Sequence, residues 1–172
     1  WRAFWETVQT EISEGAEYRE IAAEETQTVA SSTIHFLFPD KPVAEISGDV
    51  ENNNKSIVFT LTYGGTKVLF TADAEKELEE YLVQKYGDIL DADVLKVGHH
   101  GSFSSSNQPF VDAVTPSYAM ISVGAENKYH HPSPRVVRRF ERAGAQVWRT
   151  DEKGDIRVSV GEGGIRVTNV TR

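Results

Sequence analysis

The most informative stretch of this 172-residue chain is Leu95-Lys96-Val97-Gly98-His99-His100-Gly101-Ser102. Its first residues predict a strand over 94–97, and two adjacent histidines follow at once, bracketed by Gly98 and Gly101. Glycines at these positions would let the backbone come close to a ligand. Neutral imidazole is the usual nitrogen ligand of zinc, and paired histidines can divide between metal and substrate. Incidental histidines in a surface loop are the alternative, and the pattern favours a site.

A lone aspartate ends the neighbouring strand, which we expect over 67–71 as the return of a hairpin that turns at Gly64-Gly65. Ligands and catalytic groups in layered α/β sheets gather at such strand ends, which makes Asp73 a candidate ligand. The alternative is a helix N-cap, with the Asp73 carboxylate bound to the first turn of a helix over 74–86. Spacing alone favours the cap, and both interpretations stay open.

A third strand, expected over 118–123, is followed by a polar loop that carries His130 and His131. His131 is either a site residue or packs under the turn at Pro132–Pro134, and the sequence does not separate the two. His35 lies within the apolar run 33–38, which favours a core or face residue over a ligand.

Arginines form one stripe on the helix expected over 135–143, where Ser133 and Pro134 stand at the cap and first turn. They are spaced at i, i+3, i+4 and i+7 and could meet phosphate groups. The spacing favours a solvated helix face. The stripe consists of Arg135, Arg138, Arg139 and Arg142.

Composition limits the classes of protein and of site. The absence of cysteine means that any metal must be held by histidine and carboxylates. A net charge of −8 argues against broad nonspecific binding of nucleic acid. No apolar run is long enough to span a membrane, and the first residues show no signal peptide. The opening aromatic residues already fit the middle of a helix, so we expect a fragment of a longer polypeptide.

The remaining pattern predicts a single unit, with a partly antiparallel sheet layered with helices. The first helix should end at Gly15, and 40–55 is expected to be a loop. Further strands are expected at 18–22, 33–38, 56–63, 146–150, 155–160 and 165–170.

Asp and His residues therefore follow three strand ends that could share one rim. A dinuclear hydrolase needs a bridging carboxylate and several histidines to hold two cations and a hydroxide between them. Asp73, His99 and His100 are suitable residue types for such a site. They are too few to hold two metals.

Several motifs together resemble the metallo-β-lactamase domain of ComEC-type competence proteins and their soluble relatives, in the right order over nearly the whole chain. The resemblance implies an α/β fold, the metallo-β-lactamase αββα sandwich, with mixed sheets and helices on the outer faces. The motifs are Asn52–Val58, Tyr63–Gly65, Leu69–Glu75, Leu95–Ser102, Ile121–Gly124, Tyr129–Pro132 and Arg149–Ile156.

The resemblance also implies roles for the site residues. Asp73 would bridge two divalent metals, zinc or manganese, and either His99 or His100 would be a metal ligand while the other contacts substrate or supports the ligands. His100 and His131 are the expected catalytic residues, and Ser102 and His131 are expected to bind substrate. The implied activity is a phosphodiesterase or nuclease related to DNA uptake that acts through a metal-bridged hydroxide. A degenerate, non-catalytic module that binds DNA or a partner is the alternative.

Three departures from the family pattern stand out. Thr71-Ala72-Asp73 replaces Thr-Gly-Asp, and Tyr129-His130-His131-Pro132 replaces Tyr-Gly-His-Pro. The H-x-H-x-D-H motif of the first metal is absent, so we expect residues 1–172 to be the C-terminal half of the sandwich with an incomplete metal site. Such a half should expose apolar sheet surface and need its N-terminal half or a partner chain. The parent protein could also carry a membrane channel domain.

Overall fold

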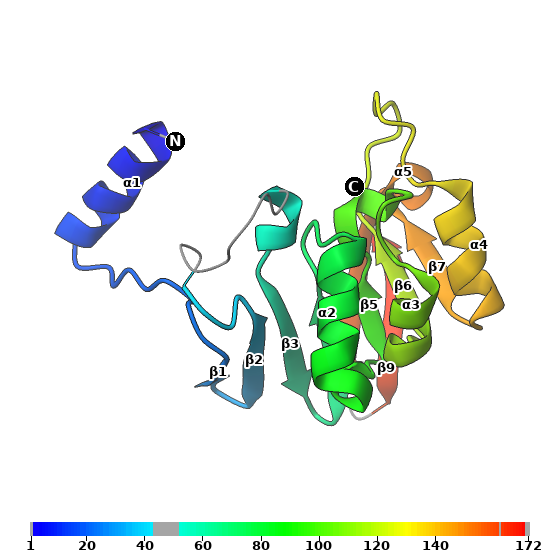
Figure 1. The fold of residues 1–172 in the computed structure, drawn as a ribbon, viewed down its shortest axis with the longest axis horizontal. Helices are drawn as coiled ribbons and strands as arrows, with labels where there is room; N and C mark the ends of the chain where they lie inside the picture. The colour runs from blue at the N-terminus through cyan, green and yellow to red at the C-terminus, as the bar shows by residue number, and fades with distance from the viewer. Residues whose placement is uncertain (1, 43–51, 162, 171–172) are drawn as a thin grey trace.

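A mixed sheet of seven strands, in the order β1 to β7 along the chain, forms the body of the protein (Figure 1). The computed structural model describes residues 2–42, 52–161 and 163–170. The first four strands pair antiparallel and the last four pair parallel, with β4 common to both sets. Their bounds are Glu25–Val29, Ser32–Phe38, Val58–Tyr63, Thr66–Phe70, Val94–Lys96, Tyr118–Ile121 and Gln146–Arg149.

Helices α2 (Lys76–Tyr86), α3 (Gln108–Val114) and α4 (Pro134–Arg142) cover one face of this sheet (Figure 1). Alternate strand residues point to that face because side chains of a strand alternate between its two sides. Leu69, Leu95 and Ala119 are fully buried there and belong to the same core as helix residues of α2, α3 and α4. The predicted partly antiparallel sheet with helices outside it is therefore observed.

The opposite face of the sheet is covered by a separate hairpin, β8 (Asp155–Gly161) and β9 (Gly164–Val170), which lies behind the sheet in Figure 1. Its inward residues, such as Val158, are only half-buried. A cavity of about 420 Å³ remains between Val158 on the hairpin and Val68 and Met120 on the sheet. The expected αββα sandwich is thus present as one complete sheet-and-helix layer and two strands facing it.

Helix α1 (Arg2–Ser13) stands away from this body, and none of its described residues is buried (Figure 1). Trp5 makes an edge contact with Tyr18 at 5.6 Å between ring centroids. No helix among the described residues is both long and apolar enough to cross a bilayer.

Several sequence-based expectations differ from the structure. The strand expected over 18–22 is wrong, because the edge strand that pairs with β2 is Glu25–Val29. Helix α3 was not anticipated. The loop expected over 40–55 contains a 3-10 helix, η2 (Asn52–Lys55), and residues 43–51 lie outside the described part. The remaining short elements are η3 (Gly87–Leu90), η4 (Gly98–Gly101) and α5 (Thr150–Lys153).

Candidate functional site

The carboxyl ends of the parallel strands β4, β5 and β6 deliver the predicted site residues to one rim of the sheet. Asp73 follows β4, the twin histidines follow β5, and His131 follows β6. The structure brings all of them together. Asp73 Oδ1 lies 3.7 Å from His100 Nε2, and the rings of His99 and His131 are 5.7 Å apart.

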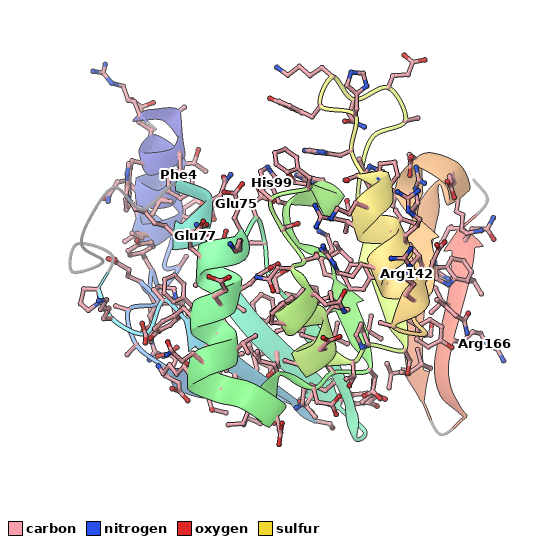
Figure 2. The ribbon with its side chains drawn as sticks, turned by 45° about the vertical axis from the view of Figure 1, so that its right-hand side comes forward. Phe4, Glu75, Glu77, His99, Arg142 and Arg166 are labelled. Atoms are coloured by element: carbon pink, nitrogen blue, oxygen red, sulfur yellow. The ribbon has the colours of Figure 1, made fainter. Side chains whose placement is uncertain are left out.

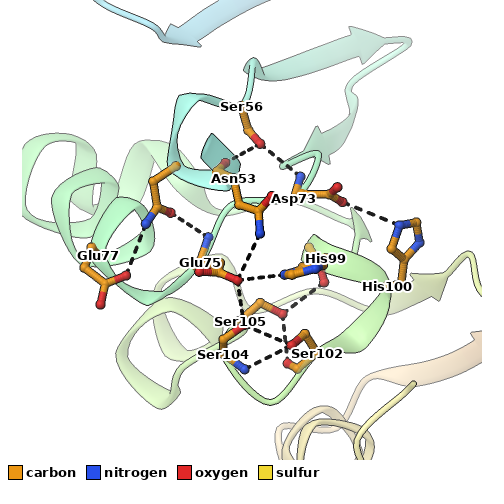
Figure 3. Close-up of polar contacts among 12 residues, drawn as sticks. Asn53, Ser56, Asp73, Glu75, Glu77, His99, His100, Ser102, Ser104 and Ser105 are labelled. Atoms are coloured by element: carbon orange, nitrogen blue, oxygen red, sulfur yellow. Dashed lines mark hydrogen bonds and ion pairs between the residues drawn. The ribbon is translucent and has the colours of Figure 1, made fainter. Parts of the chain in front are cut away.

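Asp73 and His100 form the more open side of the rim, with 45% and 49% of their side chains exposed (Figure 3). His100 Nδ1 lies 2.7 Å from the carbonyl of Ser122, which can only accept, so Nδ1 carries the proton. Nε2 of the same ring points to the Asp73 carboxylate.

The N-cap interpretation of Asp73 is wrong. Helix α2 begins at Lys76, its N-cap residue is Glu75, and no side chain caps it. The Asp73 carboxylate does not cap the helix, because hydrogen bonds from backbone N–H groups hold this turn. Asp73 N donates to Ser56 Oγ at 3.1 Å, and Ala74 N donates to the carbonyl of Thr71 at 2.9 Å.

His99 points to the other side of the rim, where Glu75 holds it (Figures 2 and 3). Its Nδ1 donates to Glu75 Oε1 at 2.8 Å, and the same oxygen accepts from Ser104 Oγ at 2.8 Å and Asn53 Nδ2 at 3.2 Å. Burial alone would raise the pKa of Glu75, but the hydrogen bonds from Ser104, Asn53 and His99 outweigh it and hold this pKa below its ordinary value. Glu75 stays charged and fixes the orientation and tautomer of His99.

Glu75 is a candidate site residue that the sequence does not single out. It lies at the end of the motif Leu69–Glu75. Its position two residues after Asp73 was the available signal, because a carboxylate near a ligand turn commonly orients a histidine.

His131 lies beside His99 and under Tyr129, with the Tyr129 and His131 rings stacked at 5.7 Å. Asn127 holds the backbone of this loop, since His131 N donates to Asn127 Oδ1 at 2.8 Å. Burial lowers the pKa of His131, and the charges of His99 and His100 lower it further. The imidazole of His131 is thus disposed to be neutral at pH 7.

A cavity of about 1050 Å³ opens next to this side of the rim. Glu75, His99 and His131 line it, whereas Asp73 and His100 lie outside its lining. Ser102 also lines the cavity, but it is buried and its hydroxyl lies 2.9 Å from Ser104 Oγ. The substrate role of Ser102 stays a prediction, and the structure adds a role in supporting Ser104.

The two glycines around the histidines pack closely against other loops of the protein, and their expected approach to a ligand stays a prediction. A Cβ on Gly98 would lie 3.0 Å from the carbonyl oxygen of Ala74, and one on Gly101 would lie 2.6 Å from Pro132 Cβ. Gly101 also has φ +78, which L side chains rarely adopt. These glycines therefore join the three loops of the rim.

Both substitutions of a family glycine fall on a left-handed backbone. Ala72 has φ +46 and His130 has φ +57. A side chain is strained at such values, which gives the physical reason for glycine in the family pattern. The carbonyl of Ala72 still accepts from His99 N at 3.0 Å, so the turn keeps its shape despite the methyl group.

Within the described residues, no group of three or more His, Asp or Glu side chains is placed to hold a metal ion. Asp73 and His100 approach each other without a third candidate ligand placed beside them in the described part of the chain. Their role as metal ligands stays a prediction. The remaining candidates, His99 and His131, face the cavity.

His35 and the arginine stripe lie apart from this pair. His35 Nε2 lies 3.1 Å from Glu24 Oε1, as a strand-face residue. Of the stripe, Arg139 turns inward and donates to the carbonyl of Ser106, while the other three arginines are exposed.

Comparison with known proteins gives a family and close relatives. Residues 51–125 match the family model of the metallo-beta-lactamase superfamily. The chain is 37% identical to competence protein ComA of Neisseria gonorrhoeae over 92% of its own length and 22% of that protein. It is 35% identical to ComE operon protein 3 of Bacillus subtilis over 87% of its length and 18% of that protein. The chain thus spans about a fifth of the length of these relatives.

Among solved structures, the chain is similar to CmlA, a diiron beta-hydroxylase from Streptomyces venezuelae, with a TM-score of 0.54. The match covers 90% of this chain and 35% of that one at 14% sequence identity, so it supports the fold alone. The family model and this likeness confirm the predicted fold class. The curated relatives confirm the resemblance to ComEC-type competence proteins.

Proposed function

We propose that this chain, which matches the metallo-β-lactamase superfamily model over residues 51–125 and is similar to competence proteins, supplies one side of the active site of a metal-dependent phosphodiester hydrolase related to DNA uptake. The observation that carries the proposal is the approach of Asp73 Oδ1 to His100 Nε2 at 3.7 Å. The substrate would be nucleic acid or another phosphodiester. The rest of the ligands would come from an N-terminal half of the domain or from a partner chain.

Asp73 and His100 fit a divalent metal such as zinc or manganese as part of its ligand set. Carboxylate oxygen and neutral imidazole nitrogen are donors that both metals accept. The hydrogen bond of His100 Nδ1 to Ser122 fixes the tautomer that such a ligand needs. When bound, divalent metals supply Lewis acidity that activates water and neutralises charge on the phosphate.

The other side of the rim would bind and orient the substrate. Glu75 fixes the ring of His99 through Nδ1, which leaves Nε2 to donate or accept at the cavity. The ring centroids of His131 and His99 are 5.7 Å apart, so His131 would act on the same phosphate. We assign His100 to the metal and His99 to the substrate, a choice that the sequence leaves open.

The test is to measure bound zinc or manganese and hydrolysis of bis(p-nitrophenyl) phosphate with the full-length protein that carries this chain. Asp73→Asn should abolish tight binding of the metal and the activity together. The matched control is Asp112→Asn, an exposed aspartate on α3 that hydrogen-bonds only Gln108. A full-length protein that holds no metal and hydrolyses no diester would refute the proposal. Residues 1–172 alone should bind metal weakly and show little turnover.

A degenerate module that binds DNA or a partner without catalysis is the second candidate. It is favoured by the fact that only two candidate ligands converge among the described residues. An intact H-x-H-x-D-H motif in the full-length protein supports the enzyme, and its loss supports the binding module.

A further inference from the structure

Two aromatic side chains stand exposed at the cavity beside His99 and His131. Phe103 is 79% exposed and Tyr129 is 66% exposed, and both line the cavity. They come from different loops, one after β5 and one after β6. Two large rings exposed to water at the mouth of one cavity are a feature of sites that stack a flat ligand.

Positive charge collects on the same side of the cavity as Tyr129. Lys128 Nζ lies 4.9 Å from the Tyr129 ring centroid, and α4 begins where Ser133 and Pro134 line the cavity. Arg135 and Arg138 follow on the exposed face of this helix, and Arg142 continues the face away from the rim (Figure 2).

These guanidinium groups are available to an anion. The arginine ion pairs within the described residues involve Arg19 and Arg149, not the exposed face of α4. The chain as a whole carries a net charge of −8, so this basic face is a local reversal of sign. The carboxylates that line the cavity, Glu75 and Glu77, lie at the α2 side, which directs an anionic ligand toward α4.

We propose that Phe103, Tyr129 and the exposed arginine face of α4 form a subsite for single-stranded nucleic acid, in which bases stack on the two rings and phosphates meet Arg135 and Arg138. The proposal rests on the proposed phosphodiester chemistry of the same rim and names its substrate. Stacking on aromatic rings together with a basic track is the combination by which proteins hold single strands. A duplex keeps its bases paired and stacked on one another, so it cannot offer them to the rings.

The experiment compares three labelled ligands of about 12 nucleotides, a length within the site sizes of ~4–16 nucleotides of single-strand binders. They are an oligothymidylate, an abasic strand with the same phosphates, and a duplex. Binding to the full-length protein is measured by fluorescence anisotropy with EDTA present, so that no strand is cleaved. The variants are Phe103→Ala, Tyr129→Ala, Phe103→Trp and the double change Arg135→Gln with Arg138→Gln. Tyr63→Ala, an exposed tyrosine on β3, is the control.

Each aromatic-to-alanine change should weaken oligothymidylate binding by roughly 5- to 150-fold and leave abasic binding unchanged, because a stacked base contributes about 1–3 kcal/mol. Phe103→Trp should keep the affinity. The arginine double variant should weaken binding of both single strands alike. The slope of log affinity against log salt concentration should fall by the equivalent of about two phosphate contacts. Tyr63→Ala should change neither.

For the aromatic-to-alanine variants, equal loss on the oligothymidylate and abasic strands, or no loss on either, would overturn the subsite. Tighter binding of the duplex, or no binding of the oligothymidylate by the wild type, would overturn it as well. Hydrolysis of bis(p-nitrophenyl) phosphate, which has no base, reports separately on the proposed chemistry. Hydrolysis without base-dependent binding refutes the subsite alone. Base-dependent binding without hydrolysis or bound metal refutes the chemistry alone.

Discussion

His99 and His100 are neighbours with the same side chain, yet they lie in two different regions of the rim. His99 is largely enclosed and bound to Glu75, whereas His100 is half exposed and faces Asp73. Both residues have a left-handed backbone, with φ +43 and φ +54, which separates their rings by 6.3 Å. Non-glycine residues adopt this region at a cost and mostly at functional sites. The strained turn thus points two neighbouring histidines of one loop to different partners, Glu75 and Ser122.

The largest expected effect would separate the two sides directly. His100→Ala should lower metal affinity and activity together, by on the order of 10³-fold in activity, because it removes a proposed metal ligand. His99→Ala should lower activity while metal binding stays. Metal content by inductively coupled plasma spectrometry and diester hydrolysis decide the matter, and the reverse pattern would exchange the two assignments.

Glu79 gives the next largest effect, on stability. Burial raises its pKa to about 7, although its carboxylate accepts from the backbone N–H groups of Asn107 and Ser106 and faces Arg139, while Glu77 opposes its ionisation. The native state therefore holds a proton that the unfolded state has lost between pH 4.5 and 7. Glu79 should stabilise the fold fully below pH 4.5 and lose roughly 3 kcal/mol as pH rises through 7.

Denaturant unfolding of the wild type and Glu79→Gln across this pH range measures the effect. The lowered pKa of His131 acts with the opposite sign, so the difference between the two proteins isolates Glu79. Equal pH dependence of both proteins would show that the carboxylate is not the source. Glu79 also bears on the difference between His99 and His100. It accepts hydrogen bonds from the backbone of Ser106 and Asn107, and the nearby Ser104 donates to Glu75, the partner of His99.

Removing the charge of Glu75 should affect the His99 side only. Glu75→Gln should reduce activity by about 10- to 100-fold, the range found for residues that orient an active-site histidine. The pH profile of kcat/KM should shift as well, since the imidazole loses its carboxylate partner. Glu80→Gln is the matched control, because Glu80 is an exposed glutamate of α2 that pairs with Lys76 and does not line the cavity. A drop in metal content with Glu75→Gln would contradict its assignment to the substrate side.

The smallest effect concerns the turn that both sides share. Ala72→Gly should stabilise the protein by about 1 kcal/mol, because glycine accepts the left-handed backbone at no steric cost. A change of that size raises Tm by roughly 2–4 °C in a protein of this length. Ala143→Gly should lower Tm instead, since Ala143 has an ordinary φ of −75 at the end of α4. Equal shifts of both variants would remove the strain argument.

The sequence alone predicted the strands that carry the site and the convergence at one rim. Strong β-forming runs, a Gly-Gly turn and strand-helix alternation are local signals, so the strands from β2 to β7 were found within a few residues. The motif at His99 and His100 gave the family. Helix α3 was missed although Asn107 caps it through Phe110 N and Pro109 follows in its first turn, both of which are readable signals.

Tertiary structure decided the contacts within the rim. The turn at Asp73 and the packing of Gly98 and Gly101 depend on neighbours that are distant in sequence. The partners of the two histidines are Glu75 from the start of α2 and Ser122 from the end of β6, and no spacing encodes which imidazole meets which oxygen. Residue types and strand ends are local properties of a chain. The tautomer of His99, the cavity and the raised pKa of Glu79 arise only when packed elements exclude water and bring their groups together.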